Sequence, residues 1–160
     1  LQEMMETYQN QSASFDAALK GKPLPDFVFK DILGNTYTPE DIKGKVVVIN
    51  LWFISCAPCI EEMPELNKLV KEYENNDAVL FLALALDEKG PRLNTFLETY
   101  VFNYNIVPDS KDYIIKKLQT NSFPTHIVLD KNSNVVFTLS GFTTGVGELI
   151  KSSINSFLGK

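Results

Sequence analysis

Two unbroken apolar stretches with a helical pattern between them constrain the fold of this chain more than any other feature. Residues 46–53 are apolar on both faces apart from Asn50, and residues 78–86 form a second stretch of the same kind. Strands of this type lie in the middle of a sheet that is covered on both sides. Residues 58–73 repeat apolar side chains at helical spacing. A strand, a helix and a strand of this length form a right-handed unit with parallel strands, so we predict an α/β domain.

The segments around this unit predict a mixed central sheet flanked by helices. A Gly34-Asn35 turn within residues 27–37 predicts an N-terminal β-hairpin, and Thr38-Pro39 begins a short helix that Gly44 ends. The other predicted elements are a helix around 91–101, a strand at 106–107, a helix that includes 114–118, strands at 123–129 and 135–139, and a helix ending near 158. We interpret residues 1–22 as an N-terminal linker or ancillary helix, and residues 23–160 as the main domain.

The only two cysteines, Cys56 and Cys59, stand where the first buried strand gives way to the helix. The N-terminus of a helix carries unpaired N–H groups and a partial positive charge, which favour a thiolate over a thiol. The thiolate is the reactive species in disulfide exchange. We therefore expect a thiol–disulfide oxidoreductase in which Cys56 is an exposed nucleophile at the helix tip. Cys59, one turn further in, is the shielded resolving thiol.

Charge and hydropathy exclude some partners. A net charge of −5 without a basic run argues against nucleic acid. The apolar stretches are far shorter than the roughly 18 residues of a membrane span. The sequence begins with Leu1 rather than Met, so we expect a processed chain or a fragment, and the start is compatible with the loss of a targeting segment or membrane anchor.

Several motifs resemble the TlpA/ResA-like family of thioredoxin-fold thiol–disulfide oxidoreductases, which act outside the cytoplasm. The thioredoxin features are Trp52 followed by Cys56-Ala57-Pro58-Cys59, and Phe123-Pro124-Thr125 before a hairpin. The family features are the segments 21–27, 42–47 and 59–64 and the helix around 91–101. The resemblance covers residues 21–158. It implies a thioredoxin-like domain over residues 23–160, with a mixed central sheet, the N-terminal hairpin and an inserted helix around 91–101.

The resemblance also implies a role for Glu62. Thioredoxins have a buried acid six positions before the first cysteine, where it manages the proton of the second cysteine. This chain has Asn50 there, which cannot titrate. The resemblance implies that Glu62, on the helix face of Cys59 and one turn away, is the acid/base group instead. The alternative is an ordinary solvated glutamate, which we expect for Glu61 and Glu65.

A substrate-binding surface follows from the same resemblance. It implies that Pro124 is a cis proline packed beside Cys56 and that the backbone of Phe123 faces outward to pair with an extended peptide. An ordinary trans proline at the start of a strand is the alternative. We expect Trp52 to be half-buried beside the site. The predicted substrate-binding residues are Trp52, Phe123, Pro124 and Thr125.

Two positions depart from the family pattern. Ser55 stands where the family commonly has a Trp, and His126 stands where a small polar or aliphatic residue is more usual. We expect His126 to be hydrogen-bonded internally or exposed. The alternative is a third Cu(I) ligand with Cys56 and Cys59, as in a metallochaperone-like protein, although such proteins usually space their cysteines by three residues. Zinc would need about four ligands, and a peroxidase would need a lone cysteine in a different loop.

The resemblance implies an extracytoplasmic reductant in the cell envelope or periplasm of a bacterium. Its substrates would be disulfide-containing exported proteins, with apocytochrome c as a candidate, and a membrane thiol reductant would supply electrons. No nucleotide, flavin or metal cofactor is required. The lack of a histidine between Cys56 and Cys59 also favours a reductant over a strong oxidant of the DsbA type.

Overall fold

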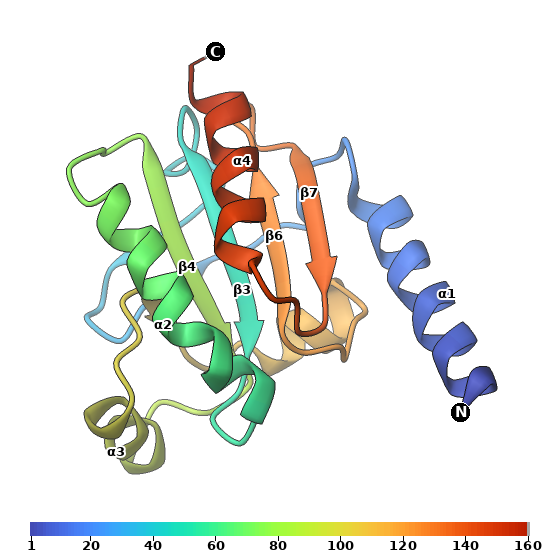
Figure 1. Cartoon of the computed structure of the whole chain (residues 1–160). Helices are drawn as coiled ribbons and strands as arrows, with labels where there is room; N and C mark the ends of the chain where they lie inside the picture. Colours follow the sequence, from blue (N-terminus) through green and yellow to red (C-terminus); the bar gives the residue numbers. More distant parts are fainter. Residues whose placement is uncertain (160) are drawn as a thin grey trace.

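The computed structural model describes residues 1–159, apart from the side chain of Tyr8; Lys160, the last residue of the predicted domain, lies outside the described residues. The elements in chain order are α1 (Gln2–Leu19), β1 (Phe29–Lys30), β2 (Thr36–Tyr37), β3 (Val46–Trp52), α2 (Ala57–Glu72), β4 (Val79–Ala85), α3 (Pro91–Thr99), β5 (Asn105–Val107), a π-helical turn η1 (Tyr113–Lys117), β6 (Thr125–Leu129), β7 (Val135–Ser140) and α4 (Val146–Leu158) (Figure 1).

The central sheet has five strands in the order β5-β4-β3-β6-β7. β3 pairs in parallel with β4, and β4 with β5, whereas β6 runs antiparallel to β3 and β7 antiparallel to β6. The predicted mixed sheet is therefore confirmed. All residues of β3 are buried, as expected for a central strand that is covered on both faces.

The two faces of the sheet carry separate hydrophobic clusters. Figure 1 shows α2 and α4 over one face, where Val46 and Val48 of β3 pack with buried residues of both helices. Val47 and Ile49 point to the opposite face and pack with residues of α1, the hairpin and η1. Because side chains alternate along a strand, Asn50 points to the same face as Val48, toward α2.

Helix α1 lies beside β7 at the edge of the sheet (Figure 1). Its Phe15 and Leu19 are buried in the second cluster. The proposed boundary between residues 1–22 and 23–160 stays a prediction. Among residues 1–159, the helices are all too short or too polar to cross a lipid bilayer.

Two local predictions differ from the structure. Thr38 does carry the hydrogen bonds of a helix start, since its N–H and Oγ1 both donate to Asp41 Oδ2 at 2.9 and 2.8 Å. Residues 38–44 nevertheless form turns, because Gly44 takes a positive φ of 82° before a second helical turn can form. The helix predicted to include 114–118 is the π-helical turn η1. The hairpin and the inserted helix are confirmed as β1–β2 and α3.

Candidate active site

The cysteine pair lies at the junction of β3 and α2. Cys56 is the N-cap of α2, with an extended backbone (φ −93°, ψ 97°), and Cys59 lies in the first turn. The two are joined by a disulfide, with Cα atoms 5.2 Å apart. The N–H of Cys59 donates a hydrogen bond to Cys56 Sγ at 3.3 Å. After reduction, this N–H and the partial charge of the helix N-terminus would stabilise a Cys56 thiolate.

Both cysteines are nearly inaccessible in the disulfide form. Cys59 is 2% exposed, but Cys56 is only 4% exposed, so the predicted exposure of Cys56 is wrong for this form. The reason is that the bond to Cys59 directs its sulfur back into the core cluster. The neighbouring Ser55 and Ala57 are exposed. They form the solvent-facing rim of the site, and Ser55 leaves that rim without the aromatic ring common in the family.

A row of buried polar side chains runs from α2 into the sheet behind the cysteines. Glu62 Oε2 lies 2.9 Å from His126 Nε2, and His126 Nδ1 lies 3.2 Å from Asn50 Nδ2. Glu62, His126 and Asn50 are 1%, 0% and 2% exposed. Asn50 and His126 face each other in the register of β3 and β6. Glu62 is therefore not a solvated glutamate, and His126 is hydrogen-bonded internally, as expected.

The second carboxylate oxygen of Glu62 differs from the first. Glu62 Oε1 is buried and has no hydrogen-bond partner among the residues that the structure describes. The buried Tyr104 side chain lies near this carboxylate; burial raises the pKa of Tyr104, and the charge of Glu62 raises it further. Tyr104 is thus a neutral neighbour. No local pattern in the sequence indicates that Tyr104 lies at the site.

The loop before β6 contains the predicted cis proline. The Phe123–Pro124 peptide bond is cis, as the family resemblance implied. The ring of Phe123 is partly exposed and packs edge-on against Phe53, with centroids 5.4 Å apart. Thr125 is buried, and its Oγ1 donates to the Ser122 carbonyl at 2.7 Å. Phe123 is the accessible side chain of this loop segment, because Pro124 and Thr125 are buried.

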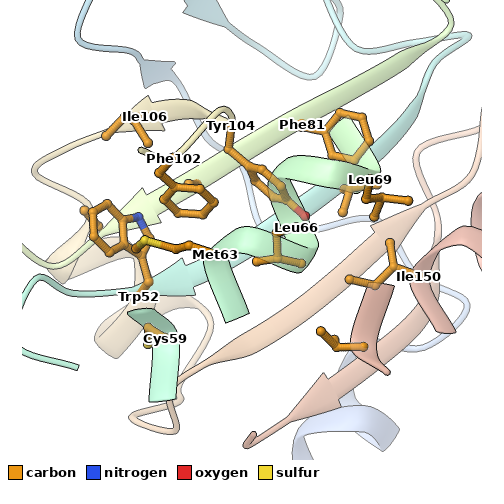
Figure 2. Close-up of a cluster of buried hydrophobic side chains, with 14 of the residues drawn as sticks. Trp52, Cys59, Met63, Leu66, Leu69, Phe81, Phe102, Tyr104, Ile106 and Ile150 are labelled. Carbon is orange, nitrogen blue, oxygen red and sulfur yellow. The ribbon is translucent and has the colours of Figure 1, made fainter. Parts of the chain in front are cut away.

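Trp52 is completely buried, so the expectation of a half-buried ring is wrong. The inserted segment covers it: the indole packs against Phe96 of α3 and Phe102, with centroid distances of 5.5 and 5.2 Å. Figure 2 shows Trp52 beside Met63, in the same cluster as Cys59. The ring therefore supports the cysteine pair from within the core.

One contact of the active-site loop was not predicted. Asp87, just after β4, accepts a hydrogen bond from the N–H of Ile54 at 2.8 Å. This bond ties the segment before Cys56 to the end of the neighbouring strand. A polar residue directly after a buried parallel strand is the signal that could have revealed it, because ligands and functional groups gather at the carboxyl ends of such strands.

The geometry does not favour the copper hypothesis. Both ring nitrogens of His126 already have partners, so the ring could join Cys56 and Cys59 as a metal ligand only by breaking a buried hydrogen bond. Within residues 1–159, no cluster of three or more His, Cys, Asp or Glu side chains is arranged to hold a metal ion.

Known proteins similar to this chain in sequence or structure include thiol–disulfide oxidoreductases and thioredoxin-like proteins. A sequence model of the AhpC/TSA family matches residues 20–138. Thiol-disulfide oxidoreductase ResA of Bacillus cereus (strain ZK / E33L) is 31% identical over 153 residues, covering 96% of this chain and 84% of that protein. Thioredoxin-like protein YneN of Bacillus subtilis (strain 168) is 34% identical over 125 residues, covering 78% and 73%. The crystal structure of a proposed thiol:disulfide interchange protein DsbE from Chlorobium tepidum superposes with a TM-score of 0.76 at 25% identity, covering 87% of this chain and 97% of that one.

Proposed function

The chain belongs to the AhpC/TSA family and is a thiol–disulfide oxidoreductase, and on that premise we propose that it reduces disulfides in exported proteins. The dipeptide between the cysteines supports the reducing direction. Pro58 has no N–H, and neither it nor Ala57 adds a positive charge beside the Cys56 sulfur. A strongly oxidising pair would need its reduced form to be stabilised, and this dipeptide offers little such stabilisation.

In the proposed reaction, the Cys56 thiolate attacks one sulfur of a substrate disulfide. The Cys56–substrate bond forms, and the other substrate sulfur leaves as a thiolate that takes a proton from solvent. Cys59 then gives its proton to Glu62 and attacks Cys56 Sγ. The Cys56–Cys59 bond forms, the second substrate sulfur leaves as a thiolate, and two electrons have passed to the substrate. A membrane thiol reductant then restores the dithiol.

One observation carries the assignment of roles: the Cys56–Cys59 disulfide at the N-terminus of α2 has the buried Glu62 carboxylate one turn behind it. Cys56 is assigned as nucleophile because its sulfur receives the helix N–H, and Cys59 as resolving thiol because it follows Cys56 in the first turn of α2. Glu62 is assigned as the proton acceptor, because it is a carboxylate on the helix face of Cys59.

We assign substrate binding to the cis-proline loop. An extended substrate segment would pair with the backbone at Phe123, beside Pro124, while the bond from Thr125 to the Ser122 carbonyl holds the loop in shape. Trp52, also predicted as a substrate-binding residue, is covered by α3, so its part in binding would be to support the loop of the cysteine pair.

A trapping experiment tests the proposed roles. Cys59→Ser removes the resolving thiol, so a mixed disulfide between Cys56 and a substrate should persist, whereas Cys56→Ser should trap none. The probe is an oxidised peptide with a Cys-X-X-Cys-His sequence, the haem-attachment motif of c-type cytochromes, compared with a peptide disulfide without this motif. Equal trapping by both variants would contradict the assignment of the nucleophile. Equal rates with both peptides would remove apocytochrome c as a favoured substrate.

Direction and location have separate tests. A reduction potential of the Cys56/Cys59 pair near the roughly −270 mV of thioredoxin is expected, and one near the roughly −120 mV of DsbA would overturn the reducing direction. We place the protein outside the cytoplasm, in the cell envelope or periplasm of a bacterium. Recovery of the native protein in the cytoplasmic fraction, with its cysteines reduced, would contradict this placement.

A further inference from the structure

Glu62 has a buried partner in His126, whose Nε2 lies 2.9 Å from Glu62 Oε2. We propose that His126 is a positioning residue, which holds one oxygen of the Glu62 carboxylate so that the other oxygen exchanges the proton of Cys59. The inference rests on the proposed role of Glu62 as proton acceptor. It concerns the only histidine of the sequence, which the proposed reaction does not otherwise use.

The hydrogen bonds fix which ring nitrogen carries the proton. The Asn50 amide nitrogen can only donate, and it lies 3.2 Å from His126 Nδ1, so Nδ1 must accept. A neutral imidazole with an accepting Nδ1 carries its proton on Nε2. Nε2 lies 2.9 Å from Glu62 Oε2, so the ring donates to that oxygen. Asn50 thus sets the tautomer, and the tautomer presents an N–H to Glu62.

The two carboxylate oxygens are therefore unequal. Oε2 is bound by His126, while Oε1 has no partner among the described residues, although Glu62 is only 1% exposed. Buried oxygens of this kind are normally hydrogen-bonded, so an unpartnered one is an exception, and a catalytic role is one explanation for it. Glu62 follows Cys59 by three positions, which places the two side chains on one helix face. Oε1 is the oxygen left free to take a proton from that face.

The neighbours of the pair leave few competing proton donors. Asn50 approaches from β3 and does not titrate, and Tyr104 approaches from the segment before β5 and stays neutral because burial raises its pKa. Cys56 and Cys59 are titratable members of the same cluster, and Tyr73, from the end of α2, packs against it. Burying a carboxylate costs free energy unless it is hydrogen-bonded. The N–H of His126 therefore also reduces the cost of burying the Glu62 carboxylate in this core.

The proton balance of the resolving step follows. The proton of the Cys59 thiol moves to Glu62 Oε1, and the neutral acid still accepts the His126 N–H at Oε2. The Cys59 thiolate attacks Cys56 Sγ, the Cys56–substrate bond breaks, and the substrate leaves as a thiolate. The proton on Oε1 then passes to solvent or to that thiolate. His126 keeps its own proton throughout, which distinguishes it from a catalytic acid or base.

The resolving step can be followed directly. Thionitrobenzoate is attached to Cys56 as a mixed disulfide, and its release by Cys59 is recorded by stopped flow over a range of pH. His126→Leu removes the donor and should slow release by roughly 10- to 100-fold, the value of a hydrogen bond to a charged group, and should alter the pH profile. His126→Gln retains an N–H in the place of Nε2 and should recover most of the rate. Ile127→Val, on the same strand but in the opposite cluster, is the matched control and should release at the wild-type rate.

The outcomes separate the two proposals. If Glu62→Gln slows release but His126→Leu does not, or if His126→Gln is as slow as His126→Leu, the positioning role is wrong and the role of Glu62 stands. If Glu62→Gln also releases at the wild-type rate, the role of Glu62 itself is wrong.

A second measurement needs no variant and therefore does not depend on folding of a mutant. Because the chain has one histidine, ¹⁵N spectra of the wild-type protein contain one imidazole. They should show Nε2 protonated and Nδ1 unprotonated in both redox forms. A proton on Nδ1 would overturn the proposal.

Discussion

Removing the imidazole of His126 while leaving Glu62 in place should destabilise the protein much more than removing both side chains. The two groups form a buried pair, with the ring 0% and the carboxylate 1% exposed and the contact at 2.9 Å. After His126→Leu, the carboxylate would be left in an apolar cluster without its only hydrogen bond to a side chain among the described residues.

The expected loss of stability in His126→Leu follows from the burial of the pair. Breaking a buried pair by removing one partner costs about 3–5 kcal/mol, because an uncompensated charge is left behind. For a domain of this size, each 1 kcal/mol lowers the melting temperature by about 2–4 °C, so the expected loss is roughly 6–20 °C. Replacing both partners by apolar residues of similar volume is often neutral or stabilising. The double variant Glu62→Met/His126→Leu should therefore recover most of the stability lost in His126→Leu.

The assay is a double-mutant cycle by urea unfolding of the disulfide form of each variant. Wild type, Glu62→Met, His126→Leu and the double variant are compared at one pH, and the coupling energy between the two sites is obtained from the four values. We expect a coupling of about 2–3 kcal/mol, near the upper end for residues in direct contact. The Ile127→Val variant gives the scale for a simple change in core packing, about 0.5–1.5 kcal/mol.

Additive effects would refute this reasoning. If the losses of the two single variants sum to that of the double variant within about 0.5 kcal/mol, the residues do not interact in the way the structure indicates. A His126→Leu variant that loses no more stability than Ile127→Val would lead to the same conclusion, because the carboxylate would then have found water or another partner.

Two further predictions concern sites away from the cysteines. Burial raises the pKa of Asp31, but hydrogen bonds from Asn35, Tyr37 and two backbone N–H groups lower it more, to a net value below the ordinary range. Asp31 therefore stabilises the fold at pH values above its unfolded pKa of about 3.9, and this contribution is lost as the pH falls toward its folded pKa. The free energy of unfolding should therefore differ less between pH 6 and pH 3.5 in the Asp31→Asn variant than in the wild type. Gly147→Ala should destabilise by about 1–3 kcal/mol, although alanine is normally preferred in helices, because its Cβ would lie 2.9 Å from Glu65 Cγ. Adding Glu65→Ala should remove that penalty, and a stabilising Gly147→Ala in thermal unfolding would contradict the predicted clash.

The core of the fold could be predicted because its signals are local. The apolar residues on both faces of 46–53 and 78–86 are sufficient to indicate two central strands, and the helical spacing between them indicates the connection. The segment 38–44 was harder to predict, because a helix-capping pair does not make a helix when a glycine with positive φ follows before the second turn is complete. The burial of Trp52 depends on where α3 folds back, which no local pattern contains.

At the site, too, local features could be predicted from the sequence, whereas long-range contacts could not. Cys56, Cys59 and Glu62 share the first turns of one helix, so their proximity follows from spacing alone. The contact between Glu62 and His126 spans 64 positions of the sequence and depends on the pairing of β6 with β3. Polar residues do occur within two largely apolar strands, at Asn50 and His126, but only the register shows that they face each other.

That register explains how a strand position without an acid can still contribute to the site. An acid at position 50 would point to the α2 face, behind the cysteine pair. The amide of Asn50 points there too and cannot take a proton, but it can donate to His126 Nδ1 and so fix which nitrogen of the ring faces Glu62. In this chain the acid therefore lies on the helix, as Glu62, rather than on the strand. Strands β3 and β6 contribute the residues that orient it. On this reasoning Asn50→Asp would not restore a thioredoxin-like arrangement. It would place a second carboxylate on the same imidazole, whose Nδ1 would have to become a donor.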